Sequence, residues 1–353
     1  MQTSIGIRAA VRNAPAYPFV AIEAAIKLDQ NESGYDFPTE LKHLALEKML
    51  HTNWNRYPQM HAETLRQKIA ARVGWTEHGV VVTPGSNVLI HALAQAAGIG
   101  QRVLSVSPAF SLYSLSAALL EAQMLEPRLN SDFSLPMQSL THELKQPTPG
   151  VLFLAVPHAP TGAMPSFEEI TALLEAASQD WIIVLDEAYF EYSGRSHLAL
   201  LETYPNLCIL RTFSKAWGLG GVRLGYLLAQ PELATHIQKI LSPFNVSALT
   251  QAVAEVALDN PSYAQTRVSE SILERQRVFA ALEPHPTWKI YPSAANYHLI
   301  RTKDAKLAHS DLLERGILVR KQDGYLGLQG CIRVSVGTPE ENTAFVTAAL
   351  ELR

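Results

Sequence analysis

The first segment that could do chemistry is an apolar run that ends on an acid. Residues 181–185 are all apolar, Asp186 follows them directly, and Tyr189 comes three residues later. Such a run predicts a buried strand, and ligands of parallel sheets bind beyond the carboxyl ends of strands. Asp186 is therefore placed to hold a ligand by its charge, although an aspartate here could equally cap the next helix.

A lysine follows a second, mostly apolar run. Lys215 stands between Ser214 and Ala216, and Arg223 lies eight residues further on. A lysine is rarely buried without a reason, so this position is either a surface loop or the site of a reactive amine. The glycines of the segment do not have the G-x-G-x-x-G spacing, because the third position falls on Arg223, and a dinucleotide fingerprint is excluded.

A third segment could bind a phosphate group. Residues 83–87, Thr-Pro-Gly-Ser-Asn, open an apolar helical pattern. The first N–H groups of a helix are unpaired and its dipole is positive at that end, so Ser86 and Asn87 lie at a natural anion site. The commoner alternative is an ordinary turn between a strand and a helix.

Together these segments match the needs of one cofactor, pyridoxal phosphate. The amine of Lys215 can form a Schiff base with the cofactor aldehyde, and Asp186 can keep the pyridine nitrogen protonated. The helix start, Ser214 and Arg223 can hold the phosphate group. No H-E-x-x-H or C-x-x-C spacing occurs in the sequence, so no metal site is predicted.

The elements that must position these segments alternate along the chain. Ser166 and Glu169 form a capping box that opens a helix towards Ser178, and a second helix is predicted over 87–97. Apolar runs predict strands covered on both faces, at Val80–Thr83, Val103–Ser107, Val151–Ala155, Trp181–Leu185, Leu207–Arg211 and Gly225–Ala229. This alternation predicts an α/β fold with a mostly parallel central sheet between layers of helices.

The C-terminal part of the chain has a different, α+β pattern. A long helix is predicted over Tyr263–Leu282 and a short one over Ser310–Arg315. Short strands are expected at Tyr297–Ile300, Ile317–Val319 and Cys331–Val336. We therefore place a domain change near residue 260, with a large cofactor-binding domain over 41–260 and a small domain made of 1–40 and 261–353.

Composition excludes several other classes of protein. The 353 residues carry 29 Lys+Arg against 33 Asp+Glu, a net charge of -4, which argues against a nucleic-acid partner. The longest uncharged runs, 80–101 and 103–120, are broken by proline and polar residues, so we expect no membrane span. The apolar stretch near the N-terminus is broken by Pro15, Pro18 and Glu23, so we expect no signal peptide. Two cysteines are typical of a reducing compartment, and we expect a cytoplasmic protein.

With these residues in place, the sequence resembles the class I/II aminotransferases of fold type I. The resemblance runs from about residue 17 to residue 341, and within the family it is most similar to the enzymes that act on histidinol phosphate. The motifs that carry it are Asn31-Glu32, Arg56-Tyr57-Pro58, Pro160-Thr161-Gly162, Asp186-Glu187-Ala188-Tyr189, Thr212-Phe213-Ser214-Lys215, Pro243-Phe244-Asn245-Val246-Ser247, Ala295-Asn296-Tyr297 and Ile332-Arg333-Val334-Ser335-Val336-Gly337-Thr338-Pro339-Glu340-Glu341.

The resemblance implies a role for each residue of the cofactor site. Lys215 would carry pyridoxal phosphate and then shuttle a proton between the substrate's Cα and the cofactor's C4′. Asp186 would pair with the pyridinium, and Tyr189 would donate to the cofactor phenolate. Phe110 would stack on the ring. The phosphate would be held by Ser86, Asn87, Ser214 and Arg223.

The resemblance also implies a substrate and a partner subunit. Arg333 would clamp the anionic group of the substrate, near Tyr17, Asn31 and Arg320. Two arginines suit a phosphate dianion better than a lone carboxylate, which favours an exchange of amino groups between histidinol phosphate and 2-oxoglutarate, a step of histidine biosynthesis. Tyr57 would reach into the partner's site, so a homodimer with shared active sites is implied.

The sequence departs from the family pattern at Ala159. Ala159 stands before Pro160 where the family usually has an asparagine that donates to the phenolate, so we expect Tyr189 to act alone unless His158 takes this place.

Three alternative functions remain open. The first alternative function is an aminotransferase with aromatic or broad specificity. The second is a lyase such as a threonine-phosphate decarboxylase, which would release carbon dioxide and need no keto acid. The third is a non-catalytic protein that keeps the fold.

Overall fold

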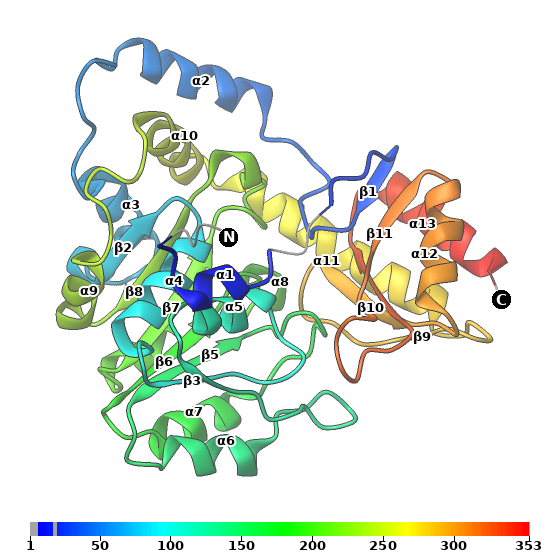
Figure 1. The fold of residues 1–353 in the computed structure, drawn as a ribbon. Helices are drawn as coiled ribbons and strands as arrows, with labels where there is room; N and C mark the ends of the chain where they lie inside the picture. The colour runs from blue at the N-terminus through cyan, green and yellow to red at the C-terminus, as the bar shows by residue number, and fades with distance from the viewer. Residues whose placement is uncertain (1–5, 17–19, 353) are drawn as a thin grey trace.

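The computed structural model describes residues 6–16 and 20–352, and these form two β-sheets with helices packed on them (Figure 1). The larger sheet has seven strands in the order β2-β8-β7-β6-β5-β3-β4, and the smaller has five in the order β1-β11-β12-β10-β9. In the larger sheet only β8 runs against its neighbours, β2 and β7. The predicted α/β fold with a mostly parallel sheet is confirmed.

The boundaries of the elements are as follows. The larger sheet consists of β2 (Val80–Thr83), β3 (Arg102–Leu104), β4 (Gln123–Leu125), β5 (Gly150–Ala155), β6 (Trp181–Asp186), β7 (Leu207–Thr212) and β8 (Gly225–Ala229). The smaller consists of β1 (Ile26–Leu28), β9 (Lys289–Ile290), β10 (Tyr297–Arg301), β11 (Ile317–Lys321) and β12 (Cys331–Ser335). The α-helices are α1 (Ala9–Asn13), α2 (Thr39–Leu50), α3 (Glu63–Val73), α4 (Ser86–Ala97), α5 (Ser111–Leu119), α6 (Met137–Leu144), α7 (Phe167–Ala176), α8 (Phe190–Ser193), α9 (Pro231–Gln238), α10 (Ala248–Asp259), α11 (Ser262–Leu282), α12 (Ala305–Glu314) and α13 (Pro339–Glu351).

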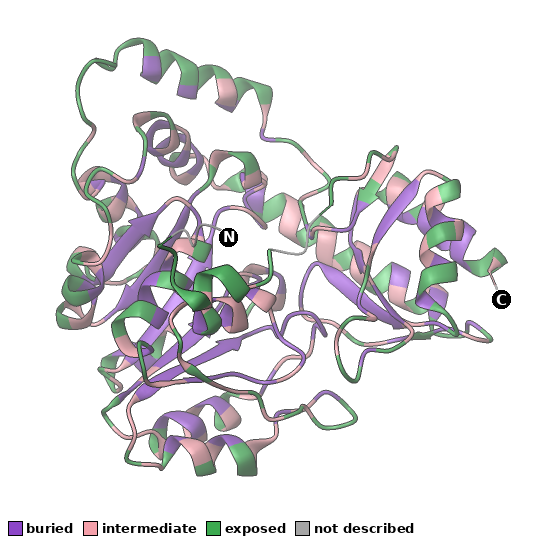
Figure 2. Ribbon diagram, viewed as in Figure 1, coloured by how far each residue is buried: buried purple, intermediate pink, exposed green. Residues whose placement is uncertain are grey.

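The central strands of the larger sheet are the apolar runs that the sequence marks. Every residue of β5, β7 and β8 is buried, as Figure 2 shows for the strands in the middle of the molecule. Strands covered on both faces need apolar side chains at consecutive positions, which explains why these runs lack a polar alternation. The edge strands β1 and β4 are short and largely exposed or half-buried, and they left no such signal.

The helices that flank the predicted site begin at residues that favour the start of a helix. At α7, the hydroxyl of Ser166 accepts from the backbone N–H of Glu169 and the carboxylate of Glu169 accepts from that of Ser166, so the capping box is confirmed. α4 begins at Ser86 because Gly85 adopts a φ of 84°, which lets the chain turn sharply out of β2. α12 begins at Ala305, five residues before the predicted start, because Asp304 caps its first turn.

The smaller sheet draws on both ends of the chain. β1 pairs in parallel with β11, and the remaining pairs of this sheet are antiparallel. α11 contacts α8 at one end and α13, β9 and β10 at the other, and so runs from the larger sheet to the smaller one (Figure 1). The division into domains at residues 40 and 260 stays a prediction.

No helix within 6–16 and 20–352 is long and apolar enough to cross a membrane.

Candidate active site

Lys215 lies in the turn after β7, where the segment that follows β1 comes close. Its Nζ donates to the backbone carbonyl of Gln30 at 2.8 Å. The pKa of this amine is lowered to about 8, first by burial and then by the charges of Arg333 and Arg223, while the charge of Glu32 opposes the shift. A lysine with such a pKa is neutral, and therefore nucleophilic, at a pH where exposed lysines are charged.

Asp186 is the last residue of β6 and is only 6% exposed. Its Oδ2 accepts from the hydroxyl of Tyr113 at 2.9 Å, and its Oδ1 accepts from the backbone N–H of Ala188 at 3.2 Å. Burial raises the pKa of Asp186 to about 6, and these two hydrogen bonds act against the rise. None of the ion pairs formed by the described residues includes Asp186. A buried acid of this kind fits a ligand that brings its own positive charge.

Tyr189 and Asn31 meet between the two sheets. The amide Nδ2 of Asn31 donates to the hydroxyl of Tyr189 at 2.9 Å, and the ring of Tyr189 packs edge-on against Tyr297 at 5.2 Å. Asn31 is buried with a φ of 54°, and its carbonyl accepts from Asn296. Asn31 thus orients Tyr189, a contact that the sequence analysis, which placed Asn31 near the substrate, did not foresee.

The residues predicted to hold the phosphate lie at the start of α4 and near Arg223. The guanidinium of Arg223 donates to the carbonyl of Gly220 at 2.9 Å and lies 3.4 Å from the hydroxyl of Ser214. A Cβ on Gly85 would lie 2.6 Å from Nη2 of Arg223, so only glycine lets this arginine reach the helix start at Ser86. The cluster combines a cation, hydroxyls and free helix N–H groups, which suits a phosphate. Asn87 is the next residue of the helix and is exposed.

Two arginines lie directly opposite each other in the smaller sheet. Arg320 of β11 pairs in register with Arg333 of β12, and residues opposite each other on antiparallel strands project from the same face. One nitrogen of Arg333 donates to the carbonyl of Asp29 at 2.7 Å, whereas its buried Nε has no hydrogen-bond partner among residues 6–16 and 20–352. The charge of Arg333 is one of the causes that lower the pKa of Lys215.

The remaining predicted residues differ in their placement. Phe110 precedes α5 and packs edge-on against Tyr113 at 5.7 Å, near Asp186. Tyr57 is 82% exposed and stacks on Phe244 at 4.8 Å, so it is not part of its own chain's cluster. Tyr17 lies outside the described residues.

The loop that contains the Ala159 departure is buried. Ala159 has no side-chain donor, and His158 beside it is 1% exposed with its Nδ1 bonded to the hydroxyl of Thr161 at 2.8 Å. Burial lowers the pKa of His158 to about 4, so its ring is neutral at physiological pH. His158 therefore lies in the interior of the protein. Among the described residues, no group of His, Cys, Asp and Glu is arranged to hold a metal ion.

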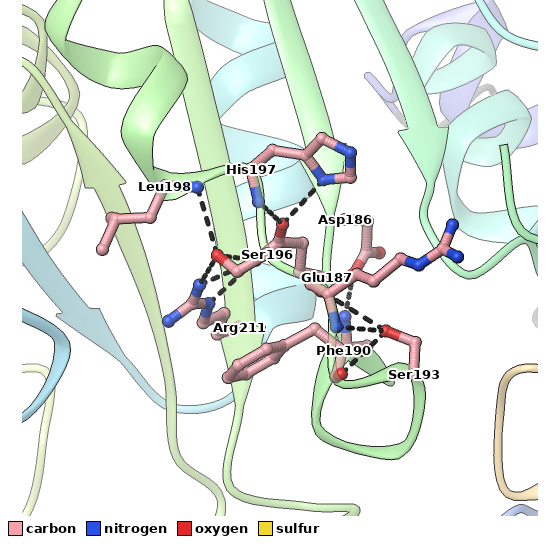
Figure 3. Close-up of polar contacts among 10 residues, drawn as sticks. Asp186, Glu187, Phe190, Ser193, Ser196, His197, Leu198 and Arg211 are labelled. Carbon is pink, nitrogen blue, oxygen red and sulfur yellow. Dashed lines mark hydrogen bonds and ion pairs between the residues drawn. The ribbon is translucent and has the colours of Figure 1, made fainter. Parts of the chain in front are cut away.

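A buried ion-pair network that the sequence analysis missed lies next to Asp186 (Figure 3). Glu187 accepts from Arg211 at 2.8 and 3.0 Å and from the backbone N–H of His197 at 2.7 Å. Burial alone would raise the pKa of Glu187, but the bonds from His197 and the charge of Arg211 lower it below its ordinary value. Because Glu187 follows β6 and Arg211 belongs to β7, the network ties together the strand ends that carry Asp186 and Lys215.

We expect Arg211→Met to lower the free energy of unfolding by about 3 kcal/mol, because it leaves the carboxylate of Glu187 charged and buried without its cation. Urea unfolding of the cofactor-free chain at pH 7 measures this loss. Since the folded-state pKa of Glu187 is depressed, its stabilising effect is present at pH 7 and is lost as the pH falls through that pKa. The matched control is Arg315→Met, which breaks an exposed pair with Glu351 and should cost less than about 1 kcal/mol. Equal losses in the two variants would contradict a structural role for the buried pair.

The fold, the buried Lys215 and Asp186, and the predicted phosphate site together indicate a class of enzyme. The chain belongs to the family of aminotransferases of class I and II, whose model matches residues 23–348. This match confirms the predicted enzyme class and fold type, with pyridoxal phosphate as the cofactor of the class.

Relatives within this family are similar over nearly the whole chain. The histidinol-phosphate aminotransferase of Deinococcus radiodurans is 51% identical over 349 residues, which cover 99% of this chain and 97% of the relative. The solved histidinol-phosphate aminotransferase from Sinorhizobium meliloti, in complex with pyridoxal-5′-phosphate, matches with a TM-score of 0.88 at 24% identity and covers 99% of this chain and 98% of that one. The L-threonine-O-3-phosphate decarboxylase from Porphyromonas gingivalis matches with a TM-score of 0.79 at 23% identity, over 92% of this chain and 98% of that one. At these identities the two structural matches show a shared fold alone.

Proposed function

We propose that this aminotransferase removes the amino group of histidinol phosphate and passes it to a 2-oxo acid, 2-oxoglutarate. The observation that carries the proposal is the cross-strand pair of Arg320 and Arg333 in the smaller sheet. The charge of Arg333 also lowers the pKa of Lys215. Two guanidinium groups on one face match the charge of a phosphate monoester. The relative that is 51% identical over nearly the whole chain bears this activity in its name, which supports the same substrate.

The proposal gives each residue of the site a task. When bound, pyridoxal phosphate supplies an electron sink for the charge that develops at the substrate's Cα. Lys215 binds the cofactor covalently and moves the proton from Cα, since its amine is neutral near pH 8. Asp186 holds the ring nitrogen in its protonated form, and Tyr189, oriented by Asn31, donates to the cofactor's phenolic oxygen. The remaining contacts come from Ser86, Asn87, Ser214 and Arg223 for the phosphate and Phe110 for the ring face.

We expect the loading of cofactor onto Lys215 to reach its full rate at a lower pH than for an ordinary lysine. Only the neutral amine attacks an aldehyde, and the pKa of Lys215 is lowered to about 8. The rate constant for the appearance of the visible absorbance band, after pyridoxal phosphate is added to the cofactor-free protein, should rise with pH and level off about one unit above 8. A rate that keeps rising beyond pH 10 would show that the amine is not perturbed.

One pair of spectra tests the substrate. The visible band of the loaded enzyme is recorded before and after histidinol phosphate is added, with no keto acid present. Conversion to the amine form of the cofactor is expected, and adding 2-oxoglutarate should restore the original band. Phenylalanine in place of histidinol phosphate tests broad specificity, and release of carbon dioxide without a keto acid would instead indicate a lyase. A band that histidinol phosphate leaves unchanged would refute the proposed substrate.

A homodimer with shared active sites is part of the proposal. Leu50, the last residue of α2, is exposed, as are Trp54 and Tyr57 on the segment that follows. Tyr57 of this segment stacks on Phe244. Exposed apolar side chains gathered in this way mark an interaction surface. Light scattering should give twice the chain mass of 38.9 kDa, and a monomer that is fully active would contradict a shared site.

We also propose a cytoplasmic location, supported by the free, buried thiols of Cys208 and Cys331.

A further inference from the structure

One buried side chain outside the predicted set touches the acid of the site. Tyr113 of α5 is 1% exposed, and its hydroxyl donates to Oδ2 of Asp186 at 2.9 Å. Its ring stacks on Phe153 of β5 at 5.1 Å with an interplanar angle of 8°, and Phe110 packs edge-on against it. Packing on two sides holds the hydroxyl in one place, so the hydrogen bond is preorganised.

The direction of this hydrogen bond is settled by the two groups that form it. Burial, together with the nearby charge of Asp186, raises the pKa of Tyr113 well above its ordinary value, so the hydroxyl keeps its proton and acts as the donor. A donor favours the charged form of its acceptor. Asp186 also accepts a hydrogen bond from the backbone N–H of Ala188, and burial works against its charge.

We propose that Tyr113 is a positioning residue for the amino-transfer reaction, which keeps Asp186 charged and aimed at the ring nitrogen of the cofactor. The inference rests on the proposed role of Asp186. The hydroxyl occupies Oδ2, so the remaining acceptor sites of the carboxylate are directed to the ligand. Through its contact with Phe110, the same side chain also sets the wall against which the cofactor ring would lie.

The test is Tyr113→Phe, which removes the hydroxyl and keeps the ring on Phe153. The loaded enzyme is prepared with pyridoxal phosphate labelled with ¹⁵N in the ring, because the ¹⁵N shift reports whether this nitrogen is protonated. In the wild type we expect the pyridinium shift. In the variant the more basic carboxylate should draw the shared proton, so the resonance moves towards the neutral pyridine value. Affinity for pyridoxal phosphate should fall about tenfold or more, as expected when a hydrogen bond to a charged group is lost.

Two further variants separate positioning from general damage. Tyr291→Phe removes a hydroxyl that accepts from Arg301 in the smaller sheet, and it should leave the shift and the affinity unchanged. In an Asp186→Asn background, Tyr113→Phe should add little, because no charge is left to stabilise.

The outcomes distinguish this inference from the proposed function. A wild-type enzyme with a protonated ring nitrogen and a Tyr113→Phe variant with the same shift and affinity would overturn the role of Tyr113 alone. Equal losses from Tyr113→Phe with and without the charge of Asp186 would show that the tyrosine merely supports the fold. A wild-type chain that fails to bind pyridoxal phosphate would instead overturn the proposed function.

Discussion

Replacing Lys215 with alanine is expected to abolish turnover, with a fall in kcat of at least about 10⁴-fold. The variant loses the covalent attachment of the cofactor and also the amine that moves the proton from Cα. Lys215 reaches its position through the turn after β7, where its Nζ donates to the carbonyl of Gln30. The rate is measured with histidinol phosphate and 2-oxoglutarate, and the cofactor should remain bound without its lysine-linked absorbance band.

The control for this variant is Lys239→Ala. Lys239 is an exposed lysine that follows α9, and its removal should leave the rate and the absorbance band unchanged. If the Lys215→Ala variant transaminates at the wild-type rate, the assignment of the whole site is wrong. If the variant is inactive but the wild type also fails with histidinol phosphate, the role of Lys215 is retained and only the proposed substrate is wrong.

Asp186→Asn is expected to lower kcat by roughly 10²–10³-fold, the usual effect of removing one preorganised electrostatic contact from a reacting centre. The amide keeps the shape of the side chain, and it can still accept from Tyr113. It cannot balance a positive charge on the cofactor, so the ring nitrogen loses its proton and the ring becomes a weaker electron sink. Steady-state kinetics should show most of the loss in kcat rather than in KM, because the contact matters most in the transition state.

Asp180→Asn is the matched control for Asp186→Asn. Asp180 is exposed and directly precedes β6, whose last residue is Asp186, so both changes neutralise an aspartate at an end of the same strand. We expect Asp180→Asn to retain the wild-type kcat. A similar kcat for wild type and Asp186→Asn would mean that another group protonates the cofactor, and it would remove the basis for the role of Tyr113.

Much of the larger sheet could be predicted from the sequence because its central strands are buried on both faces. β2 and β8 have the predicted boundaries, and β6 ends one residue later than predicted, on the acid that the motif marks. β1 and β4 were not predicted because they are short and most of their residues are exposed or half-buried, so they lack a continuous apolar run. The direction of β8 was also out of reach, because an apolar run does not reveal whether its neighbours run parallel to it.

The candidate site divides in a similar way. Lys215, Asp186 and the helix start at Ser86 were predicted from local order, because each follows a strand that the sequence itself marks. Tyr113 was missed because it lies in an apolar helical pattern that predicts only a core position. Arg211 was missed because neighbouring residues do not explain a charged side chain within an apolar run.

The sequence by itself determined which residues have the chemistry of an amino-transfer site and at which strand ends they stand. This information is local, since strand burial and helix starts depend on neighbouring residues. Only the tertiary structure decided that Tyr113 bonds Asp186 across 73 positions of the chain, that Asn31 bonds Tyr189 across 158, and that Arg320 lies opposite Arg333. Such contacts depend on the order and register in which the strands pair and on how the elements between them pack, and no local pattern of residues encodes either.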